Sequence, residues 1–502
     1  MIECYYMAKE KNEKNSENEK VTFNIDKDKN FSEWFTEIIK AAELADIRYN
    51  VKGFLVFQPW SVLSMESMYD LFEKELQKKG HKPYWYPSLI PESNFMLEKD
   101  HVEGFAPEVF WVTEHGAGEK FEERLALRPT SETAFYQMFA LWIRSYRDLP
   151  FKTYQRAQVW RYETKATRPF LRSREFYWIE THNAFASLED SKNQVKEDME
   201  TTETVLHQKL GVPYIFFERP AWDKFAGAVS TFGADTLTPD GKTLQLPSTH
   251  ILGQNFSKPF NVVFKDKDGS EKLTYLNCYG PCISRIFAGV IATHGDNSGL
   301  VFPFEIAPVQ IVIIPIAAEK DPAVLKMANK LKDELFENGY RIEVDDSDKT
   351  MGEKFYYWEM KGIPLRIEIG PKELKENHIV IFRRDTKKKE VLNPADLIDY
   401  IEKTAKKEII KNLRERADAK FKEKLKSAKD IEELKKYLEE RNLVRINFCS
   451  LEKDGEECAG IIEKTLTAKI RGKRADIQEN PSGNCVVCGK KANVVAYAAK
   501  EY

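Results

Sequence analysis

The chain has 502 residues, of which 42% are hydrophobic and 12% aromatic, and its formal net charge is -3 from 77 basic and 80 acidic residues. This length suits about three domains, and the composition excludes disordered and fibrous proteins. The near balance of charge excludes a surface that is basic all over. No apolar run approaches the ~20 residues that cross a bilayer, and the N-terminus lacks the apolar core of a signal peptide, so we expect a cytoplasmic protein.

The first elements are helical. Residues 1–30 are rich in Lys, Glu and Asn and predict a flexible lead. Apolar residues at helical spacing predict a helix over 31–47, and "GFLVFQPW" over 53–60 predicts a strand. Residues 125–150 predict one long amphipathic helix that ends at Pro150.

The middle of the chain is rich in β-branched and aromatic residues. The segments 152–164 and 174–186 predict two antiparallel strands joined by a long basic loop. Helical spacing returns over 189–210, mixed short strands follow, and 286–295 predicts a helix.

A new unit opens at Pro308. Strand and helix patterns alternate from there, as in a small doubly wound α/β domain. A charged helical stretch over 396–428 then leads to a tail that contains Cys449, Cys458, Cys485 and Cys488. Four thiolates can close a tetrahedral zinc site, while a redox pair or four unrelated thiols are the alternatives.

The segment "LRPTSETAFYQ", residues 127–137, allows two interpretations. Thr130 or Ser131 can cap a helix whose positive end favours Glu132. Alternatively, hydroxyls and a carboxylate on a stiff turn can hold a cationic ligand.

The segment "VWRYETKATRPFLRSREF", residues 159–176, is equally open. On a strand, Arg161 and Glu163 point to the same face, and the simple reading is a ladder of ion pairs on a solvated sheet. The functional reading is a nucleotide site, in which an arginine grips a carboxylate and a phosphate together and Phe176 stacks on a base.

These motifs, with "LGQNFSK" at 252–258, "HGDNSGL" at 294–300 and "APVQIVIIPI", resemble prolyl-tRNA synthetase in the form found in archaea, eukaryotes and some bacteria. The resemblance runs from about residue 30 to residue 502. It implies a multidomain α/β and α+β protein with a class II antiparallel-sheet catalytic domain, an α/β anticodon-binding domain and a small α+β zinc-binding C-terminal domain. The implied divisions are a lead (1–30), the catalytic domain (31–305), the anticodon-binding domain (306–405), and a helical linker with the zinc-binding domain (406–502).

The resemblance implies a proline–tRNA ligase. Such an enzyme joins L-proline to ATP as prolyl-adenylate, releases pyrophosphate, and transfers the prolyl group to the 3′ end of tRNA(Pro). It implies ATP as substrate, Mg²⁺, structural Zn²⁺, a homodimer and no membrane. A catalytically dead paralogue, or a sister class II enzyme for threonine or glycine, is the alternative.

The resemblance also implies site residues. Arg161 and Arg285 would be catalytic. The proline site would comprise Thr130, Glu132, Arg161, Trp178, Phe225 and His250. The ATP site would comprise Arg161, Glu163, Arg172, Ser173, Phe176, Gln245, Ser248 and Arg285. The anticodon would be read by Glu359 and Arg366, and the metal would be held by Cys449, Cys458, Cys485 and Cys488. By residue type alone, an aromatic at position 178 or 225 more often belongs to a core.

Further expectations follow from the same resemblance. Arg285 lies one residue further from Gly280 than in the eukaryotic form, which questions its reach. Tyr502 would fold back toward the catalytic domain. The interval from Glu180 to Gly280 holds only motifs of the catalytic unit, so we expect no editing domain. The basic run 383–389 is either a solvated face or a set of phosphate contacts.

Overall fold

The computed structural model describes residues 23–97, 108–163 and 166–502. Most of the predicted lead, residues 1–22, lies outside the described residues. The rest of it packs on the catalytic domain: the Phe23 ring meets the edge of Trp34, and the buried Lys27 donates from Nζ to the Gly295 carbonyl at 2.6 Å. No helix among the described residues is long and apolar enough to cross a membrane.

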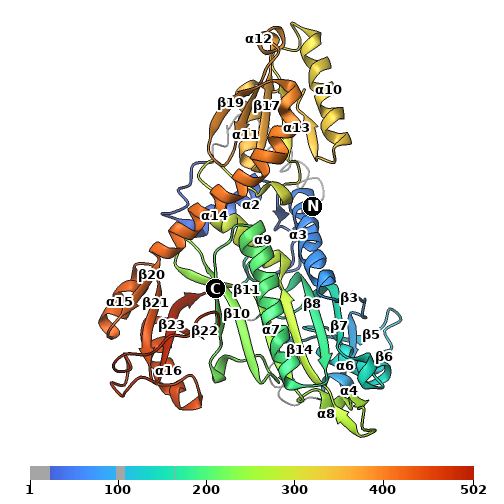
Figure 1. Cartoon of the computed structure of the whole chain (residues 1–502), viewed down its shortest axis with the longest axis vertical. Coiled ribbons are helices and arrows are strands. Elements are labelled where there is room, and N and C mark those ends of the chain that lie inside the picture. The colour runs from blue at the N-terminus through green and yellow to red at the C-terminus, as the bar shows by residue number, and fades with distance from the viewer. Residues whose placement is uncertain (1–22, 98–107, 164–165) are drawn as a thin grey trace, which may run out of the picture.

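One sheet of eleven strands runs through the lower part of the molecule, in the order β20-β21-β23-β22-β9-β10-β11-β14-β8-β7-β3 (Figure 1). Its strands within the predicted catalytic domain are β3 (Lys82–Pro83), β7 (Phe151–Trp160), β8 (Glu175–Phe185), β9 (Ile215–Glu218), β10 (Ser230–Leu237), β11 (Lys242–Gly253) and β14 (Tyr275–Pro281). The predicted antiparallel pair is confirmed, because β7 and β8 pair from Phe151 with Ala184 to Trp160 with Glu175.

Helices cover this sheet and smaller strands border it. The helices are α2 (Phe31–Ala41), α3 (Pro59–Lys78), α4 (Glu92–Phe95), α6 (Glu132–Trp142), α7 (Leu188–Thr202, followed by a π-helical turn over Glu203–Lys209), α8 (Ser257–Phe260) and α9 (Ile283–His294). The smaller strands are β1 (Ala45–Asp46), β2 (Val56–Phe57), β4 (Leu89–Pro91), β5 (Phe110–Glu114), β6 (Lys120–Leu127), β12 (Val263–Lys265) and β13 (Glu271–Leu273). The apolar faces of α2, α3 and α9 meet in one large core with the sheet.

The long helix predicted over 125–150 is wrong in length. Strand β6 occupies its start, and α6 ends at Trp142. Beyond that point Asp148 accepts hydrogen bonds from the backbone of Arg144 at 2.9 Å and Ser145 at 2.8 Å. A side chain that takes backbone donors in this way competes with the helix, so a short 3₁₀ turn replaces it.

The strand predicted over 53–60 is also shorter than expected. Only Val56 and Phe57 pair, as β2, because α3 begins at Pro59. A proline in the first turn of a helix loses no internal hydrogen bond, and its fixed φ suits the helix. The apolar run was therefore divided between a strand and a helix.

The predicted α/β unit is confirmed as a separate sheet at the top of Figure 1, in the order β16-β15-β17-β18-β19. Its strands are β15 (Ile311–Pro315), β16 (Ile342–Val344), β17 (Leu365–Ile369), β18 (Ile379–Arg383) and β19 (Lys388–Leu392). Its helices are α10 (Pro322–Glu337), α11 (Met351–Lys361), α12 (Pro371–Lys375) and α13 (Leu397–Tyr400). The first three strands are parallel, and the last two add antiparallel hairpins.

The C-terminal unit continues the catalytic sheet. Helix α14 (Lys406–Glu423) runs from the α/β unit to it. Its elements are β20 (Leu425–Ala428), α15 (Ile431–Glu439), β21 (Leu443–Phe448), α16 (Glu456–Leu466), β22 (Lys469–Arg474) and β23 (Val494–Glu501). Strand β22 pairs with β9 through Lys473 and Glu218, and β23 pairs with β11 through Lys500 and Lys242. The separate tail of the sequence is thus a lateral extension of the catalytic sheet.

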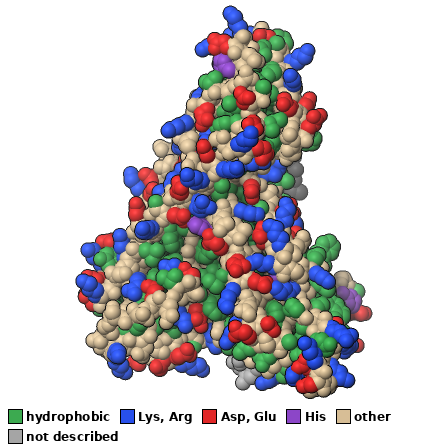
Figure 2. All heavy atoms as spheres, viewed as in Figure 1, with side chains coloured by type: hydrophobic (Ala, Val, Ile, Leu, Met, Phe, Trp, Pro, Cys, Tyr) green, Lys and Arg blue, Asp and Glu red, His purple; other side chains and the backbone are tan. Residues whose placement is uncertain are grey.

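The basic run 383–389 is split by the fold. Arg383 and Arg384 are buried in ion pairs, so they are neither a solvated face nor free for phosphates. Arg384 donates to both carboxylate oxygens of Asp296, at 2.6 and 2.8 Å, and so joins the α/β unit to the catalytic domain. Elsewhere on the visible face, cations and anions intermix, in keeping with the net charge (Figure 2).

The Arg384–Asp296 pair yields a stability prediction. We expect Arg384→Met to lower the free energy of unfolding by about 2–3 kcal/mol, because it removes the buried counter-charge of a partly buried carboxylate and leaves it the half-exposed Lys387. Lys387→Met is the matched control, since Lys387 contacts the same carboxylate at 3.1 Å from a half-exposed position.

This loss depends on pH. Desolvation opposes ionisation of Asp296, but the hydrogen bonds and charge of Arg384 outweigh it and hold the pKa of Asp296 below its usual range. A depressed carboxyl pKa stabilises the fold above the unfolded pKa and ceases to do so as pH falls. The difference in the free energy of unfolding between Arg384→Met and wild type, measured with denaturant, should narrow below pH ~4. Equal losses for both variants would contradict the assignment.

Candidate active site

Two adjoining cavities, of about 230 and 300 Å³, open on the catalytic sheet. They share Arg161, Phe176, Cys282 and Arg285. All residues predicted for proline line the first cavity, namely Thr130, Glu132, Arg161, Trp178, Phe225 and His250. The residues predicted for ATP divide between the two: Gln245 and Ser248 line the first, and Glu163, Arg172 and Ser173 line the second.

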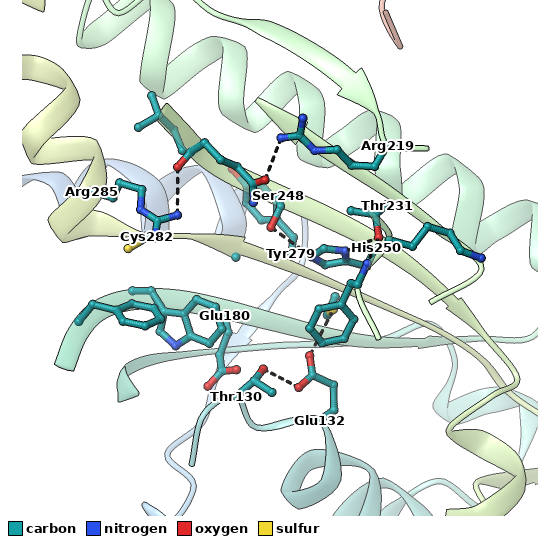
Figure 3. A pocket seen from close by; sticks show the side chains of 18 of the residues that line it. Thr130, Glu132, Glu180, Arg219, Thr231, Ser248, His250, Tyr279, Cys282 and Arg285 are labelled. Carbon is teal, nitrogen blue, oxygen red and sulfur yellow. Dashed lines mark hydrogen bonds between the residues drawn. The ribbon is translucent and has the colours of Figure 1, made fainter. Parts of the chain in front are cut away.

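The turn before α6 places two buried hydroxyls against carboxylates. Ser131 occupies the N-cap position, yet its side chain makes no capping hydrogen bond; its hydroxyl donates to Glu180 at 2.6 Å. Thr130 donates to Glu132 Oε2 at 2.5 Å. In Figure 3, Thr130 and Glu132 lie on the side of the cavity opposite Arg219 and Arg285. Ser131 thus occupies the predicted N-cap position but does not cap the helix. The hydroxyls of Thr130 and Ser131 instead orient the buried carboxylates of Glu132 and Glu180.

Glu180, a residue that the sequence did not single out, anchors this turn from β8. It accepts from Ser131 and from Gln155 at 2.8 Å, and His182 Nε2 lies 3.2 Å from its other oxygen. Burial opposes ionisation, but the hydrogen bond and charge of His182, with Arg128, hold the pKa of Glu180 below its usual value. A buried carboxylate with these partners stays charged at neutral pH.

His250 forms a neutral wall. Its ring lies 4.6 Å from that of Phe225, and its nitrogens contact the Thr231 hydroxyl at 3.0 Å and the Ser248 hydroxyl at 3.1 Å. Burial, reinforced by the charges of Arg219 and Arg161, lowers the pKa of His250 to about 3. The imidazole is therefore uncharged throughout the physiological pH range.

Arg161 stands where the two cavities meet. Its Nε donates to the Pro129 carbonyl at 3.0 Å, and its guanidinium lies over the rings of Phe176, at 5.2 Å, and Trp178, at 5.9 Å. Desolvation lowers the pKa of Arg161, yet an arginine stays protonated in such a site. One fixed positive charge thus faces both cavities.

The second cavity is flanked by an ion pair between Arg172 and Glu163, 3.3 Å apart. Arg172 also donates to an oxygen of the terminal carboxylate of Tyr502 at 2.5 Å, and the Tyr502 hydroxyl donates to Asp240 at 2.8 Å. Tyr502 therefore lies against the catalytic domain, as the resemblance implied. Arg285, in the first turn of α9, lines both cavities, so the extra residue before it does not remove it from the site.

Arg219 and Cys278 are cavity residues that sequence reasoning missed. Arg219 donates to Gln245 Oε1 at 2.8 Å, and Cys278 Sγ lies 3.6 Å from Glu132 Oε1. Burial, with the neighbouring carboxylate of Glu132, raises the pKa of Cys278, so the thiol stays a donor. Neither residue belongs to a recognisable motif, and only the pairing of distant strands brings them to the cavity.

Several buried donors at this site have no partner within the described part of the chain: Arg285 Nε, Trp178 Nε1 and the Ser173 hydroxyl. Buried polar groups are nearly always paired in folded proteins. All three belong to residues predicted to bind substrate. Their arrangement suits a ligand rich in acceptor oxygens.

Comparison with known proteins decides the family. Models of the tRNA synthetase class II core domain (G, H, P, S and T), of an anticodon binding domain and of the prolyl-tRNA synthetase C-terminal domain match residues 110–294, 310–404 and 431–502. Proline–tRNA ligases of Thermofilum pendens and Pyrococcus abyssi are 47% and 42% identical, over 95% and 94% of this chain and 98% of each relative. The structure of Giardia lamblia prolyl-tRNA synthetase in complex with prolyl-adenylate aligns with a TM-score of 0.92 and 37% identity, over 96% of this chain and 100% of that one.

The chain belongs to the prolyl-tRNA synthetase family.

This membership confirms the family and fold inferred from the sequence motifs. In the anticodon domain of this synthetase, Arg366 is buried and its Nη1 lies 3.4 Å from Glu359 Oε1. Arg366 also contacts Glu368 at 3.1 Å and lies over the rings of Phe355 and Phe382. The structure thus brings together the two predicted anticodon residues, with Glu359 the more exposed.

The four tail cysteines of the synthetase converge. The Sγ atoms of Cys449, Cys458, Cys485 and Cys488 all lie within 4.8 Å of one another. A tetrahedral zinc with Zn–S bonds of ~2.3 Å needs sulfur atoms about 3.8 Å apart, so the cluster has the right size. Gly489, at φ 70°, lets the chain turn directly after Cys488.

The role of Ser131 can be tested by stability. At a true N-cap, Ser→Gly costs a few tenths of a kcal/mol, and we expect this for Ser187→Gly, whose hydroxyl caps α7 by accepting from Asp190 N at 3.1 Å. Ser131→Gly should cost about 1–3 kcal/mol, because it removes a donor from a buried carboxylate. Denaturant unfolding of the two variants measures the difference. Equal, small losses would show that Ser131 is merely a cap.

Proposed function

We propose that this chain is a proline–tRNA ligase that forms prolyl-adenylate from L-proline and ATP and then charges tRNA(Pro). The observation that carries the proposal is the position of Arg161 between two cavities of different chemistry. The first offers Glu132 and Thr130 to a cationic imino group, and the second offers Arg172 to phosphates. The domain boundaries 31–305, 306–405 and 406–502 and the site residues belong to this proposal.

The first step is an in-line substitution at the α-phosphorus. A carboxylate oxygen of proline, already ionised at neutral pH, forms the new P–O bond, and the bond to pyrophosphate breaks with its electron pair. No proton moves, so no general base is needed. Glu132 and Thr130 hold the imino group, while Arg161 neutralises charge on the proline carboxylate and the α-phosphate.

Arg285 would stabilise the departing phosphates, since its guanidinium lines both cavities. Glu163 and Phe176 would bind the adenine, by accepting from its amino group and by stacking. Ser173, Gln245 and Ser248 complete the nucleotide site. The carboxylate of Glu108, which also lines the second cavity, suits a Mg²⁺ ion, whose charge would offset that of the triphosphate.

The second step needs tRNA. A ribose hydroxyl at its 3′ end attacks the prolyl carbonyl, AMP leaves, and the hydroxyl proton is lost. We propose that Glu359 and Arg366 read anticodon guanines, with glutamate accepting from amino and imino groups and arginine donating to O6 and N7. Glu368 and Glu359 already contact Arg366, so little of its positive charge would remain uncompensated toward a bound guanine.

Two assembly features complete the proposal. The four-cysteine cluster would hold a structural Zn²⁺. A homodimer is supported by large apolar side chains left exposed on the catalytic domain, among them Trp85, Leu89, Leu141 and Trp142. The rings of Trp142 and Tyr84 lie 5.5 Å apart, which brings Trp142 close to the segment that carries Trp85. Such patches mark subunit interfaces, and light scattering of the full chain should give a dimer mass.

Pyrophosphate exchange with each of the twenty amino acids tests the reaction. We expect exchange with proline alone. Exchange with none would indicate a dead paralogue, and exchange with threonine or glycine a sister enzyme. The bulky Trp178 and Phe225 beside Glu132 favour a ring with a secondary amine.

Two matched variants separate the substrates. Glu132→Gln should raise KM for proline at least ~30-fold, because it leaves the imino cation without its counter-charge, and should change KM for ATP little. Glu163→Gln should instead raise KM for ATP and change KM for proline little. A Glu132→Gln enzyme in which only KM for ATP rises would contradict the placement of proline in the first cavity.

Metal content tests the cysteine cluster. We expect about one Zn²⁺ per chain in the purified protein, and its loss in Cys488→Ser with a lower unfolding temperature. Cys4→Ser is the matched control and should keep the metal. A zinc-free wild-type protein with unchanged unfolding temperature after chelation would rule out a structural zinc.

A further inference from the structure

A buried network of charged groups joins the C-terminal unit to the first cavity. Asp235, on β10, lies between Arg219, which follows β9, and Arg471, on β22. Arg219 donates to both oxygens of Asp235, at 2.9 and 2.5 Å, and Arg471 Nε donates to Asp235 at 2.8 Å. The exposed fractions of Arg219, Asp235 and Arg471 are 5%, 0% and 3%.

The network is locked by its surroundings. Arg219 Nη1 also donates to the main-chain carbonyl of Arg471 at 2.9 Å, so it holds β22 as well as β10. A Cβ atom at Gly233 would lie 2.6 Å from Arg219 Nη2, so the guanidinium fills the space that a side chain there would need. Arg471 is held from outside by Glu501, at 2.5 Å, which balances the second positive charge.

The inner end of the network is Gln245. Its side-chain Oε1 accepts from Arg219 at 2.8 Å, and its main-chain carbonyl accepts from Arg285 at 3.3 Å. Because an amide oxygen that accepts from a guanidinium fixes which end of the amide is which, Gln245 presents its NH₂ donors elsewhere. Both Gln245 and Arg219 line the cavity. The orientation of a predicted nucleotide contact thus depends on a salt bridge from another domain.

We propose that Arg471 of the C-terminal unit is a positioning residue for the nucleotide, acting through Asp235 and Arg219 on Gln245. The inference rests on the proposed function, because it assigns Gln245 to ATP. Without Arg471, Asp235 has a single guanidinium partner, and Arg219 loses the second cation that fixes the carboxylate. Asp235 and the Arg219 guanidinium bound to it are then free to shift together, which moves Arg219 Nη2 away from Gln245 Oε1. Such a shift of about 1 Å is enough to weaken a positioned contact.

The charge state supports this account. Burial opposes ionisation of Asp235, but the charges of Arg219 and Arg471 outweigh it and hold its pKa below the usual value. Asp235 therefore remains an anion at neutral pH. The charged groups around Asp235 include Arg219, Arg471 and Asp223, whose charge interacts with both arginines. Beyond Arg471 lies Glu501, with Lys469 2.7 Å from it.

The test is steady-state pyrophosphate exchange by the full-length chain. We expect Arg471→Met to raise KM for ATP about tenfold while KM for proline stays within about twofold, as for loss of one charge-assisted contact to a single substrate. Arg474→Met is the matched control: Arg474 lies on the same strand but pairs outward with Asp476 at 2.9 Å, and its KM for ATP should be unchanged. An Arg471→Met enzyme with unchanged KM for ATP overturns the proposal.

A double-mutant cycle separates positioning from general loosening. If Arg471 acts through Gln245, Arg471→Met should raise KM for ATP little further in a Gln245→Ala background. Full additivity, or equal effects on both substrates, overturns the proposal. Should Arg471→Met fail to fold, Arg471→Lys keeps the charge with a single contact and enters the same cycle. If the wild-type chain shows no proline-dependent pyrophosphate exchange, the proposed function itself is wrong.

Discussion

The site depends on one face of one antiparallel sheet. Side chains two apart on a strand share a face, and β8 uses this period strictly: Phe176, Trp178, Glu180 and His182 all line the first cavity. The backbone pairing of β8 with β7 and β14 fixes that face against slippage, since a one-residue shift would turn every one of these side chains into the opposite layer. Binding groups therefore owe their convergence to strand register.

Strand β11 breaks the period, and the break is useful. Ser248 and His250 follow the rule, but Gln245, at odd spacing from them, lines the same cavity. The register shows why. Ser248 pairs with Gly233 whereas Gln245 pairs with Asp235, so β11 gains one residue between these pairs. A bulge of this kind adds Gln245 to the residues that face the cavity, and it lets one strand supply a hydroxyl, an imidazole and an amide.

The sequence predicted this site unevenly, for identifiable reasons. The aromatic and β-branched content of 174–186 predicted β8, and family motifs placed Arg161 and Glu132 in the site. A bulge has no signature in a single strand, because it is a property of two paired strands. Arg219 and Arg471 are far apart in the sequence, so neither segment by itself predicts their contact. The length of the helix predicted over 125–150 was also wrong. Helical spacing does not show that Asp148 accepts hydrogen bonds from backbone N–H groups, which competes with a longer helix.

Fixed charges, rather than titrating groups, set the orientation of a ligand here. The proposed substrate is a zwitterion, whose imino cation would face the Glu132 carboxylate and whose carboxylate would face Arg161. A protonated His250 would place another cation beside the ring wall and compete with that alignment. Because burial and the charges of Arg219 and Arg161 lower its pKa to about 3, the imidazole stays neutral and acts by shape and hydrogen bonding. The arginines would thus contribute twice, by attracting anions and by keeping the histidine uncharged, and the orientation of the bound zwitterion would not change across physiological pH.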